Sequence, residues 1–291
     1  MPLLDNKFLK QLDRLQFRCN EIFRGRFKGE RRSLNRGVGI EFSDYRPYEL
    51  GDDLRHIDWN VYARLNLPFI KLFSADEDLS IFIFVDNSKS MSFGTPAKLE
   101  CAKRIAAAFG YIGLANFDRV SIITLSDQVI PIVPLTYGKS QFPKVSRLIG
   151  AIAAAHETHL GSCLTHFAAS ARQSGAAIVI SDFLDSDGYE LGLKQLKSRK
   201  FDLTVIQLLS DEELRPKLSG ELRLEDAESG KKKGLTVSDR ALASYRERVD
   251  AFCDGLKGFC LNQGITYIKI DNRVPIEEFF LQNLHKTGLI L

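Results

Sequence analysis

The strongest constraint on the fold is a short apolar run that ends in acidic and hydroxyl side chains. Residues 81–85 read Ile-Phe-Ile-Phe-Val, and Asp86, Ser88 and Ser90 follow. A continuous apolar run of this length is typical of a strand buried on both faces of a parallel sheet, since a helix needs about ten residues or more. The run is also far too short to span a bilayer. An α/β fold is therefore expected.

A second apolar run, residues 176–180, also leads into an acid, Asp182. Between the two runs, Gly161 and Ser162 suggest a glycine turn with a hydroxyl at the start of a helix. In an open α/β sheet, ligands bind beyond the carboxyl ends of the strands, where the strand order reverses. Carboxylates and hydroxyls suit hard divalent cations. We therefore predict a site for Mg²⁺, or for Mn²⁺ or Ca²⁺, whose ligands are Asp86, Ser88, Ser90, Ser162 and Asp182.

The rest of the core alternates strands and helices, which predicts a mostly parallel, doubly wound sheet. Thr95 and Pro96 are expected to open a helix, as N-cap and first helical residue. Pro131 places its strand at a sheet edge. Residues 211–236 depart from the alternation and predict an exposed β-hairpin insertion. Further strands are expected at 120–125, 203–208 and 265–270, and helices at 139–154, 163–173, 187–198 and 238–262.

The first 75 residues are expected to form a helix and strand extension packed on a core of residues 76–291. Helical spacing of apolar residues covers 3–23. The basic stretch 24–36 is either a solvated loop or a surface for an anionic partner. Next comes a dense mixture of aromatic and charged residues that predicts a packed, hydrogen-bonded module. Its notable residues are Asp52, Asp53, Arg55, Asp58 and Trp59, and we interpret the acids as turn caps and ion pairs rather than catalytic groups.

Composition narrows the class of protein. Apolar residues make up 44% of the chain and charged residues 26%, as in ordinary globular proteins. A net charge of +3 is too small to imply a nucleic-acid partner. The five cysteines form no Cys-x-x-Cys pair, which favours a reducing compartment. No signal peptide or membrane span is apparent, so a cytoplasmic protein without direct membrane insertion is expected.

Three motifs that suggest an enzyme do not meet their requirements. Gly138-Lys139-Ser140 lacks the glycine that a phosphate-binding P-loop needs five positions earlier, where Val133 stands. His156 and His159 are three residues apart, whereas a zinc-protease motif separates its histidines by four. A phosphatase with a nucleophilic Asp86 would need a second acid at position 88, which is serine. These patterns do not support ATP binding or proteolysis.

The chain resembles the prokaryotic family called domain of unknown function 58, whose core is von Willebrand factor A-like. The resemblance covers roughly residue 8 to the C-terminus. The motifs that carry it are Gly37-Val-Gly-Ile-Glu-Phe42, Arg46-Pro-Tyr-Glu-Leu-Gly-Asp-Asp-Leu-Arg-His-Ile-Asp-Trp59, Asp86-Asn-Ser-Lys-Ser-Met91 and Ser181-Asp182-Phe183.

The resemblance implies a metal-ion-dependent adhesion site. Asp86, Ser88 and Ser90 match its first loop, Ser162 takes the place of a threonine in the second, and Asp182 matches the distal acid. The second loop of the family usually reads Gly-Gly-Thr. Serine keeps the hydroxyl but lacks the methyl group that restricts the rotamer of threonine. This difference concerns the metal affinity of the site more than its geometry.

Two functions are consistent with these residues. The first is a non-catalytic binding module in which a partner's Asp or Glu completes the metal shell. The resemblance implies that a MoxR-type AAA+ ATPase is the partner, with a role as an adaptor in protein assembly or maturation. The alternative is a metal-dependent hydrolase that acts on phosphate esters through Asp86 and Asp182.

Because the two acids are expected to repel each other without metal, removal of Asp182 is predicted to cost little stability.

Overall fold

The chain forms two compact units in the computed structural model, residues 20–78 and residues 1–19 together with 79–291. The second of these is called the main unit, and the first the small unit. The residues whose structure is described are 3–17, 40–49, 54, 57–75, 79–126, 128–154, 159–185, 187–216, 220–225, 232–283 and 289.

Over its described residues, the main unit is built on a six-stranded sheet of order β10-β7-β6-β3-β4-β5. Every neighbouring pair is parallel except the antiparallel pair of β4 and β5. This is the doubly wound order, whose switch point lies between β3 and β6. The predicted α/β class and the edge position of the strand with Pro131 are both confirmed. The strands are β3 (Ser80–Asp86), β4 (Arg119–Leu125), β5 (Val129–Tyr137), β6 (Ala176–Ser181), β7 (Asp202–Leu209) and β10 (Thr266–Asp271).

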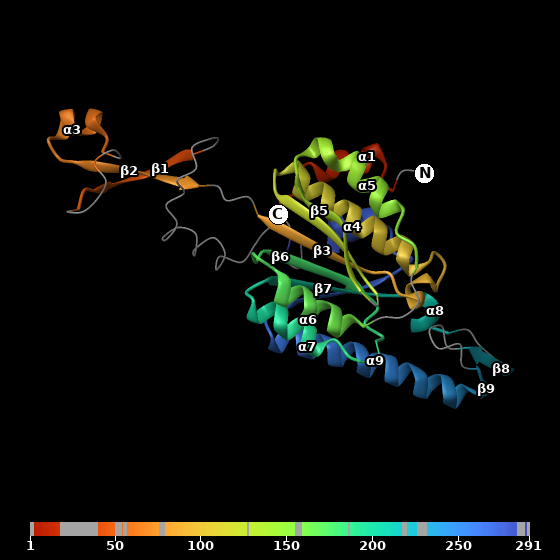
Figure 1. Ribbon diagram of the computed structural model, residues 1–291. Helices are drawn as coiled ribbons and strands as arrows, with labels where there is room; N and C mark the ends of the chain where they lie inside the picture. Colours follow the sequence, from red (N-terminus) through yellow and green to blue (C-terminus); the bar gives the residue numbers. More distant parts are fainter. Residues whose placement is uncertain are drawn as a thin grey trace. The chain divides into compact units, whose positions relative to one another are not determined.

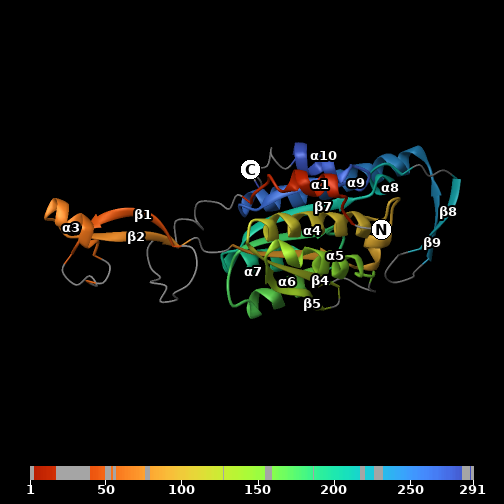
Figure 2. The same cartoon turned by 90° about the horizontal axis from the view of Figure 1, so that it is seen from above.

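Helices cover both faces of this sheet (Figure 1). Strand β3 contributes alternate side chains to two cores, with Ile81, Ile83 and Val85 on one face and Phe82 and Phe84 on the other. Figure 2, seen from above, looks down on the helix layer that contains α4 and α5. The first face is covered by α1 (Asn6–Leu12), α4 (Lys98–Ala115), α5 (Phe142–Gly150) and α10 (Ile276–Glu278), and the second by α6 (Leu160–Ser170), α7 (Glu190–Ser198) and α9 (Asp239–Asn262).

The expected insertion is an antiparallel hairpin of β8 (Gly220–Glu225) and β9 (Lys232–Val237). It follows the short helix α8 (Asp211–Leu214). The predicted tip lies largely outside the described residues, since 226–231 are not described. The remaining short helices are the 3-10 helices η2 (Lys89–Ser92) and η3 (Lys139–Gln141) and the π-helix η4 (Phe279–Asn283). Among the described helices, none combines the length and the apolar character needed to cross a membrane.

The small unit pairs β1 (Ile40–Pro47) with β2 (Phe69–Ala75), and α3 (Trp59–Leu65) lies between them in the chain. Asp58 caps α3 by accepting hydrogen bonds from two backbone amides, as expected for a turn cap. The side chain of Trp59 is 61% exposed, and its expected role in docking the N-terminal segment onto the core stays a prediction. Asp52, Asp53 and Arg55 lie outside the described residues.

Three expected details of the helices differ from the structure. The first helix ends at Leu12 rather than at 23, and residues 18–39 are not described. The helix after β3 begins at Lys98, with Ala97 as its N-cap, so a cap by Thr95 is wrong. Gly161 lies inside α6, where an added Cβ would meet the carbonyl oxygen of Gly188 at 2.6 Å. Close approach of the chain, rather than a turn, therefore requires this glycine.

The structure leaves the expected domain division open. Residues 1–19 belong to the main unit, where Leu4, Phe8 and Leu12 of the N-terminal segment are buried in the core. Residues 20–78 form a unit of their own. Docking of the whole 1–75 extension on the 76–291 core stays a prediction.

Candidate metal centre

Asp86 ends strand β3 and is almost completely buried. One of its carboxylate oxygens, Oδ1, accepts the backbone N–H of Ser88 at 2.9 Å, which closes a tight loop after the strand. The other, Oδ2, accepts the hydroxyl of Ser181 at 2.5 Å. Both donors are uncharged. The adjacent β6 therefore supplies a side chain that fixes the carboxylate of Asp86.

Asp182 directly follows strand β6 and is also buried. Its Oδ1 accepts the backbone N–H of Leu184 at 3.0 Å. Between these two residues, Phe183 adopts a left-handed conformation with φ of 62°, which is unfavourable for a residue with a Cβ. Its ring is buried and packs edge-on against Tyr189, so packing offsets the local strain. Burial of Phe183 thus helps to fix the turn that orients Asp182.

Two serines connect the strand ends. The hydroxyls of Ser88 and Ser90 lie 3.0 Å apart, and Ser90 Oγ donates to Asp182 Oδ2 at 2.8 Å. The chain of hydrogen bonds therefore runs from Asp86 through the loop to Asp182. Four of the five residues predicted from the sequence form one cluster at the carboxyl ends of β3 and β6.

The fifth residue, Ser162, is exposed in the first turn of α6. In the described part of the chain it makes no hydrogen bond to the other four. The start of α6 is nevertheless tied to the loop after β6, because Leu160 N donates to Asp185 Oδ2 at 2.6 Å. His159 contacts Asp187 of the same loop at 2.8 Å. The role of Ser162 as a metal ligand stays a prediction.

Lys98 is a member of this cluster that the sequence analysis missed. Its ammonium lies 2.6 Å from Asp182 Oδ2 and 2.6 Å from Glu213 Oε1, and its side chain is fully buried. Glu213 is fixed in turn by a capping box with Ser210 at the start of α8. A single lysine at the start of a helix normally indicates an exposed side chain. The apolar residues of α4 gave no sign that this lysine points into the sheet end.

The two acidic strand ends differ in their electrostatics. Burial, and to a smaller extent the nearby Asp182 carboxylate, together raise the pKa of Asp86 to about 7, although hydrogen bonds from Ser181 and Ser88 oppose the shift. For Lys98, burial lowers the pKa, but the charges of Asp182 and Glu213 outweigh it and the net shift is upward. Lys98 therefore remains a cation at neutral pH, whereas Asp86 gains or loses its proton close to neutral pH.

The donor set determines which metal could bind. Among the described residues, no three His, Cys, Asp or Glu side chains are grouped as a metal site. A cation at the Asp86 cluster would thus be held by two carboxylates and by serine hydroxyls. An oxygen-only set with few charges suits Mg²⁺, which keeps several of its waters. The chemistry of Asp86, Ser88, Ser90 and Asp182 is compatible with such an ion.

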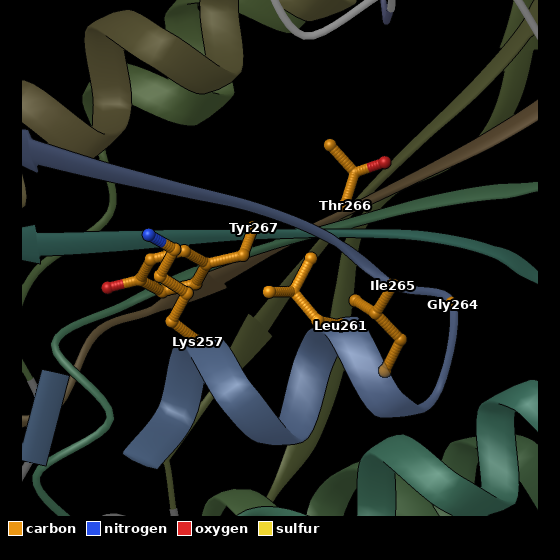
Figure 3. A pocket seen from close by; sticks show the side chains of 6 residues that line it. All are labelled: Lys257, Leu261, Gly264, Ile265, Thr266 and Tyr267. Atoms are coloured by element: carbon orange, nitrogen blue, oxygen red, sulfur yellow. The ribbon is translucent and has the colours of Figure 1, made fainter. Parts of the chain in front are cut away.

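A pocket of about 310 Å³ lies at the other end of the sheet (Figure 3). Side chains of Lys257 and Leu261 from α9 line it beside Tyr267 of β10. Tyr267 donates its hydroxyl to Gln207 Oε1 at 2.5 Å. Because Thr266 begins β10, this pocket lies at the amino end of a parallel strand, opposite to the Asp86 cluster. It contains none of the predicted site residues.

Comparison with known proteins places these features in a family. A curated relative from Mycobacterium tuberculosis, described as uncharacterized, is 27% identical over 256 residues, or 84% of this chain and 80% of its own length. A relative from Mycobacterium bovis, also described as uncharacterized, matches equally well.

Two solved structures are similar to this chain at lower sequence identity. The conserved hypothetical protein BatB from Bacteroides thetaiotaomicron is 16% identical with a TM-score of 0.45, over 72% of this chain and 98% of that one. A von Willebrand factor type A protein from Catenulispora acidiphila is 18% identical with a TM-score of 0.39, over 62% of this chain and 43% of that one.

A family model matches residues 44–251. The matched region contains both acidic strand ends, Lys98 and Glu213. Since the match spans more than half of the sequence, the chain belongs to the family described as protein of unknown function DUF58.

Proposed function

We propose that this protein is a non-catalytic binding module that recognises a partner through a divalent metal ion at the Asp86 cluster. The observation that carries the proposal is the hydrogen-bonded connection of Asp86, Ser88, Ser90 and Asp182 at the switch point of the sheet. These residues would hold Mg²⁺, or Mn²⁺ or Ca²⁺. The ion would supply a positive centre that a carboxylate from outside can complete.

The surface beside the cluster is suited to a protein partner. Phe93 follows the serine loop and is 51% exposed, and Leu184 follows Asp182 and is 50% exposed. Lys89, in the serine loop itself, is also exposed. A metal-bound carboxylate flanked by apolar side chains on the partner would match this surface, since interfaces combine a few charged anchors with apolar contacts.

Binding is favoured over catalysis by how the two acids are engaged. Asp182 is paired with Lys98 and accepts two further hydrogen bonds, and Asp86 accepts two. Neither is placed as a free nucleophile or base, which a phosphate-ester hydrolase acting through these acids would need. Hydrolysis by Asp86 and Asp182 remains the alternative that the experiment below also tests.

The partner that we propose is a MoxR-type AAA+ ATPase, with a role in protein assembly or maturation, which is the expectation from the sequence resemblance described above. A cytoplasmic setting is part of the proposal. It is in keeping with four buried free thiols, Cys101, Cys163, Cys253 and Cys260, because reduced cysteines are usual in reducing compartments.

The test is a titration of the candidate ATPase against wild type with Mg²⁺, wild type with chelator, and Asp86→Asn. We expect binding only in the first case, with a loss of roughly thirtyfold or more in the others, because loss of one partner of a buried charged contact costs about 2–5 kcal/mol. Equal affinities in all three would refute metal-dependent binding. Phosphate-ester turnover that Asp86→Asn abolishes would instead support the hydrolase.

A further inference from the structure

The proposed metal site already contains a cation of its own. Lys98 is fully buried, and its ammonium contacts Asp182 on one side and Glu213 on the other, each at 2.6 Å. The proposed binding function makes no use of this lysine. A buried ammonium requires charged partners, because desolvation of an unpaired charge is very costly. The ammonium charge of Lys98 would act on any metal ion that binds beside it.

Lys98 and a bound metal would share the same carboxylate. Asp182 Oδ2 accepts both the ammonium of Lys98 and the hydroxyl of Ser90. A divalent ion that draws on Asp182 therefore lies close to a fixed positive charge. Like charges repel strongly where water is excluded. Lys98 must consequently lower the affinity of the site for any cation.

Glu213 has the opposite effect, and its own contacts prevent it from becoming a ligand. Its Oε1 accepts Lys98, and its Oε2 accepts the backbone N–H of Ser210 at 2.8 Å. The backbone N–H of Glu213 in turn donates to Ser210 Oγ at 3.1 Å. This capping box fixes the carboxylate beside Lys98, where it offsets part of the ammonium charge. Glu213 must consequently raise the affinity of the site for a cation.

We propose that Lys98 and Glu213 form a built-in charge pair that sets the metal affinity of the site, Lys98 by competing for Asp182 and Glu213 by restraining that competition. This inference rests on the proposed metal-dependent function. It makes Lys98 the cation that keeps the end of β6 assembled in the metal-free protein. It also makes the affinity dependent on a residue of α8 that does not ligate the metal.

The test measures Mn²⁺ affinity by calorimetry at pH 8 for the full chain and for variants at both positions. We expect Lys98→Met to bind Mn²⁺ at least about tenfold more tightly and Glu213→Gln about tenfold more weakly, since one neighbouring charge changes the proton affinity of a carboxylate by a similar factor or more. The double variant should lie near wild type. A purely structural role would weaken binding in both single variants.

Two matched controls are available in the chain. Lys144→Met removes an exposed lysine from α5, and Glu212→Gln removes the neighbouring acid of α8, which contacts Arg273 rather than Lys98. Both should change the affinity by less than about threefold, because the lysine is exposed and screened by salt and Glu212 is already paired with Arg273. If Lys98→Met fails to fold, Glu213→Gln against Glu212→Gln decides the matter, and equal affinities overturn the proposal.

The outcome for wild type separates this inference from the proposed function. If wild type binds no Mn²⁺ but Lys98→Met does, the proposed function fails and the competition by Lys98 stands. If neither binds, both fail. If wild type binds and the two single variants shift in the same direction, or not at all, the metal site stands and the charge pair is refuted.

Discussion

The ends of β3 and β6 have the same sequence signature, a buried apolar strand followed by an aspartate, yet the structure treats the two acids differently. Asp86 is surrounded by uncharged donors, the backbone N–H of Ser88 and the hydroxyl of Ser181. Asp182 is paired with the ammonium of Lys98. The same pattern in a sequence can therefore give one carboxyl group that takes up a proton near neutral pH and another that belongs to an ion pair.

The largest expected effect comes from a matched pair of substitutions, measured without metal at pH 8. Asp182→Asn leaves Lys98 buried with only Glu213, so we expect the free energy of unfolding to fall by about 3–5 kcal/mol. Asp86→Asn removes a buried charge without a cationic partner and should cost nothing or raise that free energy. Urea denaturation measures both. Similar losses in the two variants would remove the distinction between the strand ends.

This first prediction reverses an expectation from the sequence. Repulsion between the two acids suggested that Asp182 contributes little to stability. The contact with Lys98 makes the expected contribution of Asp182 to stability large and favourable, because the acid neutralises a buried ammonium. No spacing rule revealed that contact, since Lys98 lies in another element, 84 residues from Asp182 along the chain.

The second prediction uses pH, again without metal. The pKa of Asp86 is raised from 3.8 to about 7 in the folded protein. Between these values the folded state binds a proton that the unfolded state has released, so stability falls as pH rises and levels off above about 7. From pH 5 to 8 we expect a loss of about 2–3 kcal/mol in the free energy of unfolding.

Asp86→Asn is the control for this profile, because it should remove the slope that Asp86 contributes. The comparison is made by urea denaturation in chelating buffer at each pH. An unchanged slope in the variant would show that Asp86 is ionised throughout, like the acid of an ordinary ion pair.

The third prediction concerns added metal. Binding to the folded state alone raises the free energy of unfolding by about 1.4 kcal/mol when free Mg²⁺ is ten times its dissociation constant. Wild type should show this shift at pH 8, measured as a rise in the thermal midpoint. Asp86→Asn should not, since it lacks a ligand. A shift of equal size in the variant would place the metal elsewhere.

The smallest effects distinguish two serines. Ser90 connects the strand ends through Asp182, so Ser90→Ala should lower the free energy of unfolding by about 1 kcal/mol. Ser162 is exposed, and Ser162→Ala should change it by less than about 0.5 kcal/mol. Chemical denaturation of both variants without metal measures this. Metal titration of Ser162→Ala then tests separately whether the hydroxyl is a ligand.

Most of the fold, and the clustering of four predicted residues, could be predicted from the sequence because both follow from local patterns. The apolar runs of β3 and β6, the edge strand with Pro131 and the hairpin insertion were all recognisable from residue type and spacing. Four site residues could be placed together because parallel strands bring their carboxyl ends to one edge of the sheet.

The features that were missed depend on contacts between distant elements. Lys98 reads as an ordinary surface residue until α4 is packed against the end of β6. Gly161 indicates a turn by residue type, whereas the structure requires glycine there because the backbone of Gly188 in the next loop approaches it closely. The conformational propensity of a residue concerns its own backbone, so it gives no information about contacts with residues that are distant in the sequence.

The central position of β3 has a consequence for how the protein is made. The hydrogen bond from Ser181 at the end of β6 to Asp86 at the end of β3 joins residues 95 positions apart in the chain. At ribosomal rates of about 5–20 residues per second, β3 is synthesised roughly 5–20 s before β6 can pair with it. During that interval one of its edges and the carboxyl of Asp86 have no β6 partner. During synthesis the chain therefore carries an unpaired strand edge, which is the kind of surface that promotes aggregation.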